Sequence, residues 1–303
     1  ILKYRKFNKL KNTYLDALQN SVHPKSSRIH STFHQVIAST GRLSSTNPNF
    51  QNIPIRTDEG REVRKAIRPQ IDTWKILSAD YSQVELRVLA HLSQDKELCD
   101  AFNRGEDIHS RTASHVFNVP IENVIPEMRR IAKVVNFGII YGAGPFRMSQ
   151  ELKIPRSEAA VIIKSYFNQY NGIQNYINST LETARNKKYV ETILGRKRPI
   201  WDLDNSNGIR RKAAERMAIN MPIQGTAAEM IKLAMNTIYK NIIKNKMESK
   251  MILQIHDELL FEFPNSEKET LIKLVKNKME QALHLTVPVI VEYGIGDNWY
   301  EAH

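Results

Sequence analysis

Two pairs of acidic residues have the types and the spacing to hold a divalent metal ion. Asp80 follows a short apolar run at residues 74–77, which predicts a buried strand, and precedes apolar residues at helical spacing from Val84 onward. An acid between a strand and a helix is fixed by the sheet and open at its edge, and Ser82 is placed to cap the helix. Glu85 follows on the first turns of that helix. Taken alone, such a pair is more often a helix cap and a solvated face.

The second pair is Asp257 and Glu258, which follow His256 between two apolar segments, 251–255 and 259–263. This pattern predicts two strands joined at the acids. Two carboxylates at the tip of a hairpin repel each other unless a cation lies beside them. The pattern therefore indicates a second set of metal ligands.

One predicted helix, residues 126–142, carries cations and aromatic rings in a row. Its ridge consists of residues four apart: Arg129, Lys133, Phe137 and Tyr141. Arg and Lys suit phosphate charge, and rings stack on bases, so the ridge could hold a triphosphate, a sugar and a base. A surface helix with an aromatic pair is the alternative. The sequence Gly-Ala-Gly-Pro at 142–145 is expected to end the helix and let it pivot.

Further polar residues have the chemistry to bind a nucleic acid. His109 follows a predicted helix cap, Asp107, and could reach a phosphate, although a single His is more often structural. Amides and guanidinium groups suit phosphates, sugars and minor-groove acceptors. They gather in a loop that contains Arg42, Asn49, Gln51, Asn52 and Arg56, and in a helical region that contains Arg216, Asn220 and Gln224. Pro222 is expected to interrupt that helical region.

The charge of the chain is positive and unevenly distributed. The 303 residues carry a net charge of +12, and residues 1–79 alone hold 14 Lys and Arg against 5 Asp and Glu. A basic segment in front of a nearly neutral, acid-containing one suggests a polyanion held beside a catalytic centre, with a solvated basic surface as the alternative. The single cysteine, Cys99, excludes an internal disulfide and a multi-cysteine zinc site.

No apolar run approaches the length needed to cross a membrane, and no signal peptide is visible, so a cytoplasmic protein is expected. The chain begins at Ile1 rather than at Met, within a basic segment that is predicted to be helical. We therefore expect it to be part of a longer protein.

Several separated segments together resemble one family, the family A (bacterial DNA polymerase I-like) DNA polymerases. Asp80-Tyr-Ser-Gln-Val-Glu85 resembles its motif A, Arg129 to Gly142 its motif B, and His256-Asp-Glu258 its motif C. The segments 40–54 and 216–224 resemble its primer–template contact segments. The resemblance covers the whole chain, from Ile1 to His303. Residues 142–146 depart from the more usual Gly-Met/Ile-Ser-x-Phe that follows this helix.

The resemblance implies an α+β fold of the right-hand polymerase type. A mainly antiparallel palm sheet would hold Asp80 and Asp257, beside a large helical fingers subdomain. The expected subdomains are the end of the thumb at 1–26, the palm at 27–86 and 201–303, and the fingers at 87–200. The rest of the thumb, and any nuclease domain, would lie outside this chain.

The resemblance also implies a reaction and its site residues. Deoxynucleotides would be added from dNTPs to a primer 3′-OH, by a monomer in the bacterial cytosol and nucleoid or in an organelle of bacterial origin. Asp80, Asp257 and the main-chain carbonyl of Tyr81 would hold two Mg²⁺ ions, with Glu258 as a less certain third carboxylate. The triphosphate would lie against Arg129, His109 and Lys133, and Lys133 would also protonate the leaving pyrophosphate.

The same resemblance gives roles for the remaining residues. Phe137 would pack on the sugar, in the form that selects against dideoxynucleotides, and Tyr141 would lie against the template base. Glu85 would occupy the space that a ribose 2′-OH needs. Primer–template DNA would be contacted by Arg42, Asn49, Gln51, Asn52, Arg56, Arg216, Asn220, Gln224 and His256.

Three other functions are weighed against this one. A single-subunit RNA polymerase shares the palm acids, but Glu85 argues against ribonucleotides. A metal-dependent nuclease would also use paired acids, but it has no need of the Arg-Lys-Phe-Tyr ridge. A catalytically incomplete primer–template-binding fragment is a further alternative, because the chain is expected to be incomplete.

Overall fold

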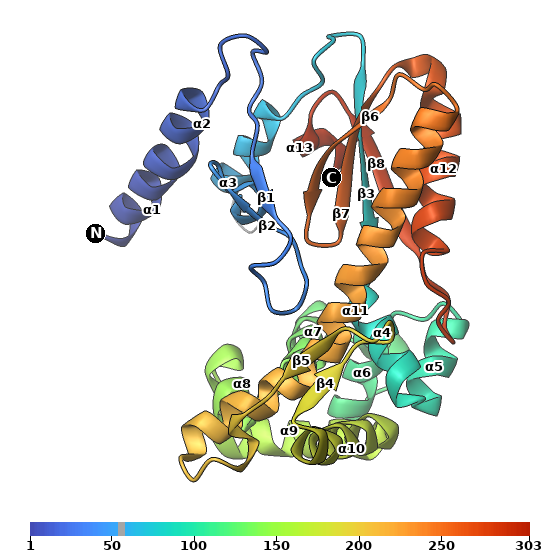
Figure 1. Cartoon of the computed structure of the whole chain (residues 1–303). Coiled ribbons are helices and arrows are strands. Elements are labelled where there is room, and N and C mark those ends of the chain that lie inside the picture. The colour runs from blue at the N-terminus through green and yellow to red at the C-terminus, as the bar shows by residue number, and fades with distance from the viewer. Residues whose placement is uncertain (54–57) are drawn as a thin grey trace. The chain divides into compact units, whose positions relative to one another are not determined.

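The computed structural model describes residues 1–53 and 58–303, which fall into two compact units (Figure 1). Unit 1 comprises residues 1–82, 228–282 and 290–303, and unit 2 comprises residues 83–227 and 283–289. The long helix α11, Gly208–Lys244, contributes to both units. The predicted thumb, palm and fingers boundaries are not tested by this division and stay a prediction.

Unit 1 is built on a four-stranded sheet, visible in the upper part of Figure 1. Its strands are β3, Lys75–Tyr81; β6, Lys250–Ile255; β7, Glu258–Phe263; and β8, Val291–Gly296. The order in the sheet is β6-β7-β3-β8, and every neighbouring pair is antiparallel. An antiparallel sheet combined with many helices confirms the predicted α+β class.

The two faces of this sheet differ in chemistry because side chains alternate along each strand. Leu77, Ala79 and Tyr81 of β3 share one face with apolar residues of β7, and helix α12, Lys268–Glu280, packs on β3 and β8. The Tyr81 hydroxyl donates to the carbonyl of Met279 on α12 at 2.7 Å. The opposite face carries Ser78 and Asp80, so the acids lie on the face that does not bear α12.

The acid-bearing face is also packed against other elements of unit 1. Ile76 and Leu260 join an apolar cluster that includes Tyr14, Phe50 and Trp299. The elements that supply and support this cluster are α1, Leu2–Leu10; a π-helical turn, Lys11–Asp16; α2, Ala17–Asn20; β1, Thr32–His34; β2, Ser44–Thr46; α3, Asp58–Glu62; and α13, Trp299–Ala302. Short 3₁₀ turns lie at Phe50–Asn52, Val63–Ala66 and Asn265–Glu267.

Unit 2 is mainly helical. Its helices are α4, Val84–Ser93; α5, Lys96–Asn103; α6, Ile108–Phe117; α7, Pro126–Ile140; α8, Pro145–Leu152; α9, Arg156–Gln169; and α10, Asn171–Lys187, followed by the first part of α11. A small hairpin of β4, Tyr189–Glu191, and β5, Lys197–Pro199, joins α10 to α11. Short 3₁₀ turns lie at Ile121–Asn123 and Asp202–Asp204. The contact between α6 and α7 is among the most extensive in this unit.

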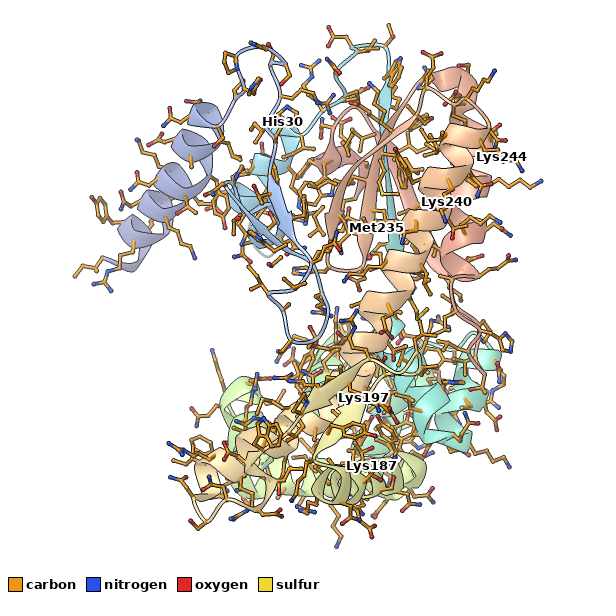
Figure 2. All side chains as sticks on the ribbon, viewed as in Figure 1. His30, Lys187, Lys197, Met235, Lys240 and Lys244 are labelled. Atoms are coloured by element: carbon orange, nitrogen blue, oxygen red, sulfur yellow. The ribbon has the colours of Figure 1, made fainter. Side chains whose placement is uncertain are left out.

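The expected break at Pro222 is wrong, because α11 continues through this proline. Proline removes one hydrogen bond from a helix and crowds the preceding turn. Its neighbours Met221 and Ile223 are both fully buried, so tertiary packing holds the helix together around it. Farther along, the exposed side of α11 carries Lys240 and Lys244 (Figure 2).

Among the described residues, no helix combines the length and the apolar character that crossing a membrane requires.

Candidate active site

Asp80 lies near the end of β3, between two other strands of the sheet. Its cross-strand partners are Glu258 on β7 and Glu292 on β8. Residues paired across antiparallel strands project on the same face, so three acids lie on one face of the sheet, near one end of β3. The expected role of Ser82 as a helix cap is wrong, because its hydroxyl donates to Glu292 at 3.0 Å and α4 has no side-chain cap.

Asp257 lies in the two-residue turn between β6 and β7, as the apolar segments on either side of it predicted. His256, the other turn residue, has a φ of 55°, in the left-handed region that a tight turn requires. The main-chain N–H of Tyr81 donates to the carbonyl of Asp257 at 3.3 Å. This bond ties the turn to the end of β3, so the structure brings both predicted metal-binding acids to one place in unit 1.

The environment of these two acids disfavours their charge. Burial and the charges of Asp257 and Glu258 raise the pKa of Asp80 to about 8. Burial also raises the pKa of Asp257, against the nearby positive charge of Arg42. The Oδ1 atom of Asp80 is enclosed and has no hydrogen-bond partner among the described residues. A carboxylate held in this state gains most from a cation.

Glu258 is bound differently, although it is next to Asp257 in sequence. Its Oε1 accepts hydrogen bonds from Ser78 Oγ at 2.6 Å and from Trp299 Nε1 at 2.7 Å, and His303 Nδ1 lies 3.4 Å away. Burial alone would raise the pKa of Glu258, but these partners outweigh it and hold the pKa below its ordinary value. Its predicted catalytic role stays a prediction, and its visible role is to fasten α13 to the sheet.

The donors near Asp80 suit the predicted metal. Across the described parts of the chain, no group of three or more His, Cys, Asp or Glu side chains is placed to bind one ion. The ligands predicted from the family resemblance, Asp80, Asp257 and the main-chain carbonyl of Tyr81, stay a prediction, and all of them are oxygen donors of the kind that Mg²⁺ prefers. The unpartnered Oδ1 of Asp80 supports the fit.

Helix α7 in unit 2 presents the predicted ridge. Lys133 is exposed, Phe137 is half-buried, and Tyr141 caps the end of the helix. The rings of Phe137 and Tyr141 are stacked with centroids 6.4 Å apart. The four predicted residues therefore follow one another along the same helix, which ends at the Gly-rich segment as expected.

Arg129 already has an anionic partner on the neighbouring helix. Its Nε and one terminal nitrogen donate to Oδ2 of Asp107 at 3.1 and 2.6 Å. Asp107 also caps α6, as predicted, through Oδ1, which accepts from the N–H of Ser110 at 2.7 Å. A phosphate that binds Arg129 must therefore compete with this ion pair.

His109 lies on α6 beside the ridge and is only 3% exposed. Its ring is 5.9 Å from the ring of Phe137, and its Nδ1 is 3.0 Å from Nδ2 of Asn136. Burial, together with the charges of Arg129 and Lys133, lowers the pKa of His109 to about 4 despite the opposing effect of Asp107. His109 is therefore neutral at pH 7 and offers a hydrogen bond rather than a charge.

Glu85 is also buried, on the first turn of α4. The hydroxyl of Tyr141 donates to its Oε2 at 3.0 Å, so one interaction links the predicted sugar-selecting acid to the aromatic end of the ridge. The Gly142 backbone, with a φ of 63°, follows directly. A Cβ at Gly142 would lie 2.8 Å from Cγ of Arg216 on α11, so this position has no room for a side chain.

The predicted DNA-contact residues are divided between the units. In unit 1, Asn49 caps a 3₁₀ turn by accepting from the N–H of Gln51 at 3.0 Å. Gln51 donates to Gln254 of β6 at 3.2 Å, and Gln254 in turn donates to the carbonyl of His256. Three further members of the unit 1 set are half-buried or exposed at the surface: Arg42, Asn52 and His256. Arg56 lies outside the described residues.

The unit 2 members, Arg216, Asn220 and Gln224, are spaced by four residues on α11 and are all half-buried. The Oδ1 atom of Asn220 is enclosed without a hydrogen-bond partner among the described residues. Because α11 continues through Pro222, the four-residue spacing places these side chains on one stripe of the helix, which the expected break at Pro222 would have interrupted.

Several structural partners of these residues were missed from the sequence. Ser78 lies two residues before Asp80 on the same strand face, a spacing that the strand period could have revealed. Trp299 and His303 are distant in sequence from Glu258, and no local pattern connects them with it. Asn136 lies next to Phe137 in the sequence of α7 but is buried, and the four-residue spacing of the ridge does not include it.

Comparison with known proteins gives a consistent result. The family model for DNA polymerase family A matches residues 1–301. The chain is 49% identical to the thermostable DNA polymerase I of Thermus thermophilus and 46% identical to DNA polymerase I of Geobacillus stearothermophilus, in each case over 302 residues. These alignments cover the whole chain but only 36% and 34% of the two relatives, so the chain spans about a third of their length.

A solved structure agrees with these relatives. The POL domain of Pol1 from M. smegmatis, in a complex with DNA primer-template and dNTP, matches 99% of this chain with a TM-score of 0.94 and 46% sequence identity. The match covers 53% of that chain. With the family model matching nearly every residue, the chain belongs to DNA polymerase family A.

Proposed function

We propose that this chain is the catalytic part of a template-directed DNA polymerase, which adds deoxynucleotides from dNTPs to a primer 3′-OH in replication and repair. The observation that carries the proposal is the pair Asp80 and Asp257, two half-buried acids that are brought together at one end of the sheet and whose pKa values are raised. In a member of this family, such a pair is best explained as a metal-binding centre. The M. smegmatis relative, solved with DNA primer-template and dNTP, supports the substrate class.

The metal site would consist of Asp80, Asp257 and the carbonyl of Tyr81. The chemistry supplied by two bound Mg²⁺ ions would be activation of the primer 3′-OH and neutralisation of the triphosphate. Two features of unit 1 hold the proposed metal ligands in place. The sheet fixes Asp80, and the bond from the Tyr81 N–H to the Asp257 carbonyl fixes the turn.

The triphosphate would bind along α7. Arg129 and Lys133 would supply positive charge, and Lys133, which is exposed, would also protonate the leaving pyrophosphate. Arg129 would exchange Asp107 for a phosphate, which makes nucleotide binding a competition between two anions. His109, being neutral, would donate a hydrogen bond.

The residues that follow Lys133 on α7, together with Glu85, would select the sugar and the base of the nucleotide. Phe137 would pack on the deoxyribose, and Glu85 would occupy the space of a 2′-OH. Tyr141 holds Glu85 through its hydroxyl and would itself lie against the template base. Closing of α7 over a correct pair would complete the site, with the Gly-rich segment at its end as the pivot.

Primer–template DNA would be held by the basic and amide residues of both units, with Arg42, Gln51, Arg216 and Gln224 on minor-groove acceptors. His256 would lie near the primer end. We further propose that the chain acts as a monomer in a bacterial cytosol or a related organelle, and that residues 1–26 are the end of a longer thumb.

Primer extension tests the proposal directly. The chain, assayed alone and in a version extended at its N-terminus by a complete thumb, is given primer–template, Mg²⁺ and either dNTPs or rNTPs. Templated growth with dNTPs alone is expected, and Asp72→Asn, a substitution of an exposed acid, should leave it unchanged. Tight primer–template binding without growth in the extended version would instead favour a catalytically incomplete binding fragment.

A further inference from the structure

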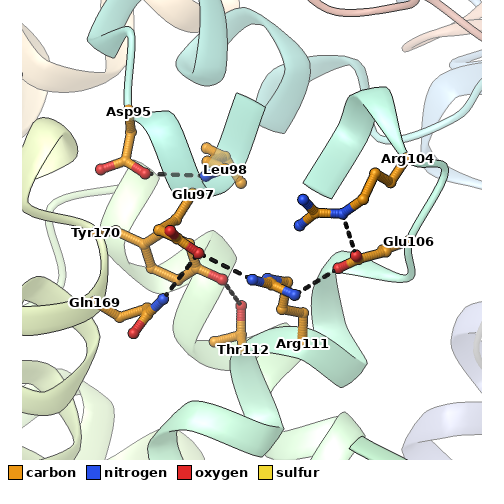
Figure 3. A network of polar contacts seen from close by, with 9 residues as sticks. All are labelled: Asp95, Glu97, Leu98, Arg104, Glu106, Arg111, Thr112, Gln169 and Tyr170. Atoms are coloured by element: carbon orange, nitrogen blue, oxygen red, sulfur yellow. Dashed lines mark hydrogen bonds and ion pairs between the residues drawn. The ribbon is translucent and has the colours of Figure 1, made fainter. Parts of the chain in front are cut away.

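A chain of buried polar side chains runs from His109 into the interior of unit 2. His109 on α6 contacts Asn136 on α7, Asn136 contacts Thr112 on α6, and Thr112 contacts Tyr170 at the end of α9. The three distances are 3.0, 3.2 and 3.2 Å, and each of these residues is at most 3% exposed. Figure 3 shows the contact between Thr112 and Tyr170, beside the ion pairs of Arg111.

The hydrogen bonds of this chain have one direction. Thr112 Oγ1 donates to Oδ1 of Asn136, so the single hydroxyl proton of Thr112 is used there. Tyr170 must then donate its own hydroxyl proton to Thr112, and the Asn136 Nδ2 group faces His109 as a donor. His109 Nδ1 has to accept, which leaves the ring proton on Nε2.

We propose that Asn136 is a positioning residue for nucleotide binding: it fixes His109 in the neutral tautomer that carries its proton on Nε2. This inference rests on the proposed function, in which His109 meets a phosphate. Phosphate oxygens accept hydrogen bonds, so only the Nε2–H tautomer offers them a donor. In the other tautomer Nε2 would present a lone pair and repel the phosphate.

The same arrangement disfavours a charged His109. Protonation would place an N–H at Nδ1 against the N–H groups of Asn136, two donors facing each other without an acceptor. The charged groups that act on the ring are Asp107 on its own α6 segment, and Arg129 and Lys133 on α7. Arg129 and Lys133 therefore supply positive charge to the phosphate, and the neutral ring of His109 supplies one oriented hydrogen-bond donor at Nε2.

The contact of Asn136 with His109 also couples the position of α7 to the position of α6. It lies between Lys133 and Phe137 in the sequence of α7, whereas His109 belongs to α6. The amide therefore aligns a side chain of one helix with the ridge of the other. Breaking this bond leaves a buried donor or acceptor unsatisfied, which makes a second arrangement of the ring costly.

The tautomer can be read without substrate by NMR of the protein labelled with ¹⁵N-histidine. Protonated and unprotonated ring nitrogens have very different ¹⁵N shifts, and the His109→Gln variant identifies the signals of His109. We expect Nε2–H in the parent protein. A proton on Nδ1 in the parent would overturn the proposal.

Substitutions within the chain of hydrogen bonds sharpen the measurement. Asn136→Asp puts an acceptor beside Nδ1, so His109 should shift to the Nδ1–H or the doubly protonated form and its pKa should rise. Thr112→Val frees the amide to turn and should give a mixture of tautomers. Tyr170→Phe is the matched control: it removes the far end of the chain, leaves the Thr112–Asn136 bond, and should keep Nε2–H.

Kinetics then tests the link to the nucleotide. Asn136→Leu, which removes both polar atoms at similar size, should raise KM for dNTP about tenfold with a smaller change in kcat, as should His109→Gln. The double variant should be no worse than either single one. An unchanged KM in Asn136→Leu would overturn the positioning role. If no variant or parent extends a primer, the proposed function fails, but the NMR result still decides the tautomer.

Discussion

The acid cluster of unit 1, which consists of Asp80, Asp257 and Glu258, and the ridge of α7 in unit 2 differ in how their charged groups are balanced. In the acid cluster, one enclosed oxygen of Asp80 has no hydrogen-bond partner within the part of the chain that the structure describes, and burial together with neighbouring carboxylates raises the pKa of Asp80 to about 8. On the ridge, Arg129 is paired with Asp107 and His109 with Asn136. In the first region burial and mutual repulsion outweigh the nearby positive charge of Arg42 and disfavour the charged carboxylates, whereas in the second region Arg129 and His109 already have hydrogen-bonded partners.

This difference shows how each region must respond to its ligand. A cluster of carboxylates whose charged forms are disfavoured gains from a cation mainly because the cation relieves their mutual repulsion. A ridge with satisfied partners binds only by exchanging them, so its affinity is a difference between two similar interactions. We infer that metal binding is the more strongly driven event and nucleotide binding the more selective one.

The largest expected effect comes from Asp80 compared with Glu258. Asp80→Asn should lower primer extension by on the order of 10³-fold, because it removes a metal ligand, and should leave DNA binding largely intact. Glu258→Leu should lower activity less but should destabilise unit 1 by about 1–3 kcal/mol, because the buried donors Ser78 Oγ and Trp299 Nε1 lose their acceptor. Single-turnover extension and urea unfolding measure the two effects. Equal losses of activity would contradict the contrast between these acids.

The next effect concerns the sugar. Glu85→Ala should increase the use of rNTPs relative to dNTPs by about 10²-fold, because the space for a 2′-OH opens. Tyr141→Phe should give a smaller shift in the same direction, since Glu85 keeps its place but loses the hydroxyl at 3.0 Å. The ratio of kcat/KM for the two nucleotide types measures this selection. An unchanged ratio in Glu85→Ala would rule out its assigned role.

The two regions should also respond to pH with opposite signs in the metal-free protein. The pKa of Asp80 is about 8 when folded and near 3.8 when unfolded, so the folded state binds more protons between these values and stability falls as pH rises. The pKa of His109 is about 4 when folded and near 6.5 when unfolded, so stability rises with pH across that window. Each slope is at most about 1.4 kcal/mol per pH unit.

Amide hydrogen exchange by mass spectrometry separates the two slopes, because peptides from β3 and α6 are read individually. Asp80→Asn should remove the decline in β3, and His109→Gln should remove the rise in α6, each compared with the parent protein at the same pH. A decline of the same size in Asp80→Asn would show that another group is responsible.

The smallest effect tests the competition at Arg129. Asp107→Asn keeps an oxygen for the N–H of Ser110 but removes the charge that holds Arg129. KM for dNTP should fall about threefold, since a surface ion pair is worth less than about 1 kcal/mol. Ion pairs that are this exposed are also screened, so the difference from the parent should shrink at high salt. A raised KM would mean that Asp107 orients Arg129 rather than competes for it.

The sequence predicted most of the elements that carry the site and few of the contacts between them. A strand before Asp80, the hairpin turn at Asp257 and the ridge of α7 follow from local patterns of apolar runs, helical spacing and glycine, although β3 extends past the predicted strand as far as Tyr81. The helix through Pro222 and the bond from Ser82 to Glu292 could not be predicted in this way, because tertiary packing decides both. For the same reason, the partners of Glu258 were missed.

The contact between Gly142 and Arg216 has a consequence for how related sequences can vary. A side chain at Gly142 would collide with Arg216, and the φ of 63° there already favours glycine. Gly144, two residues later, has no neighbour within 4 Å of a Cβ and has an ordinary backbone conformation. In an alignment of relatives, we therefore expect position 144 to change freely and position 142 to stay glycine whatever residue stands at position 216.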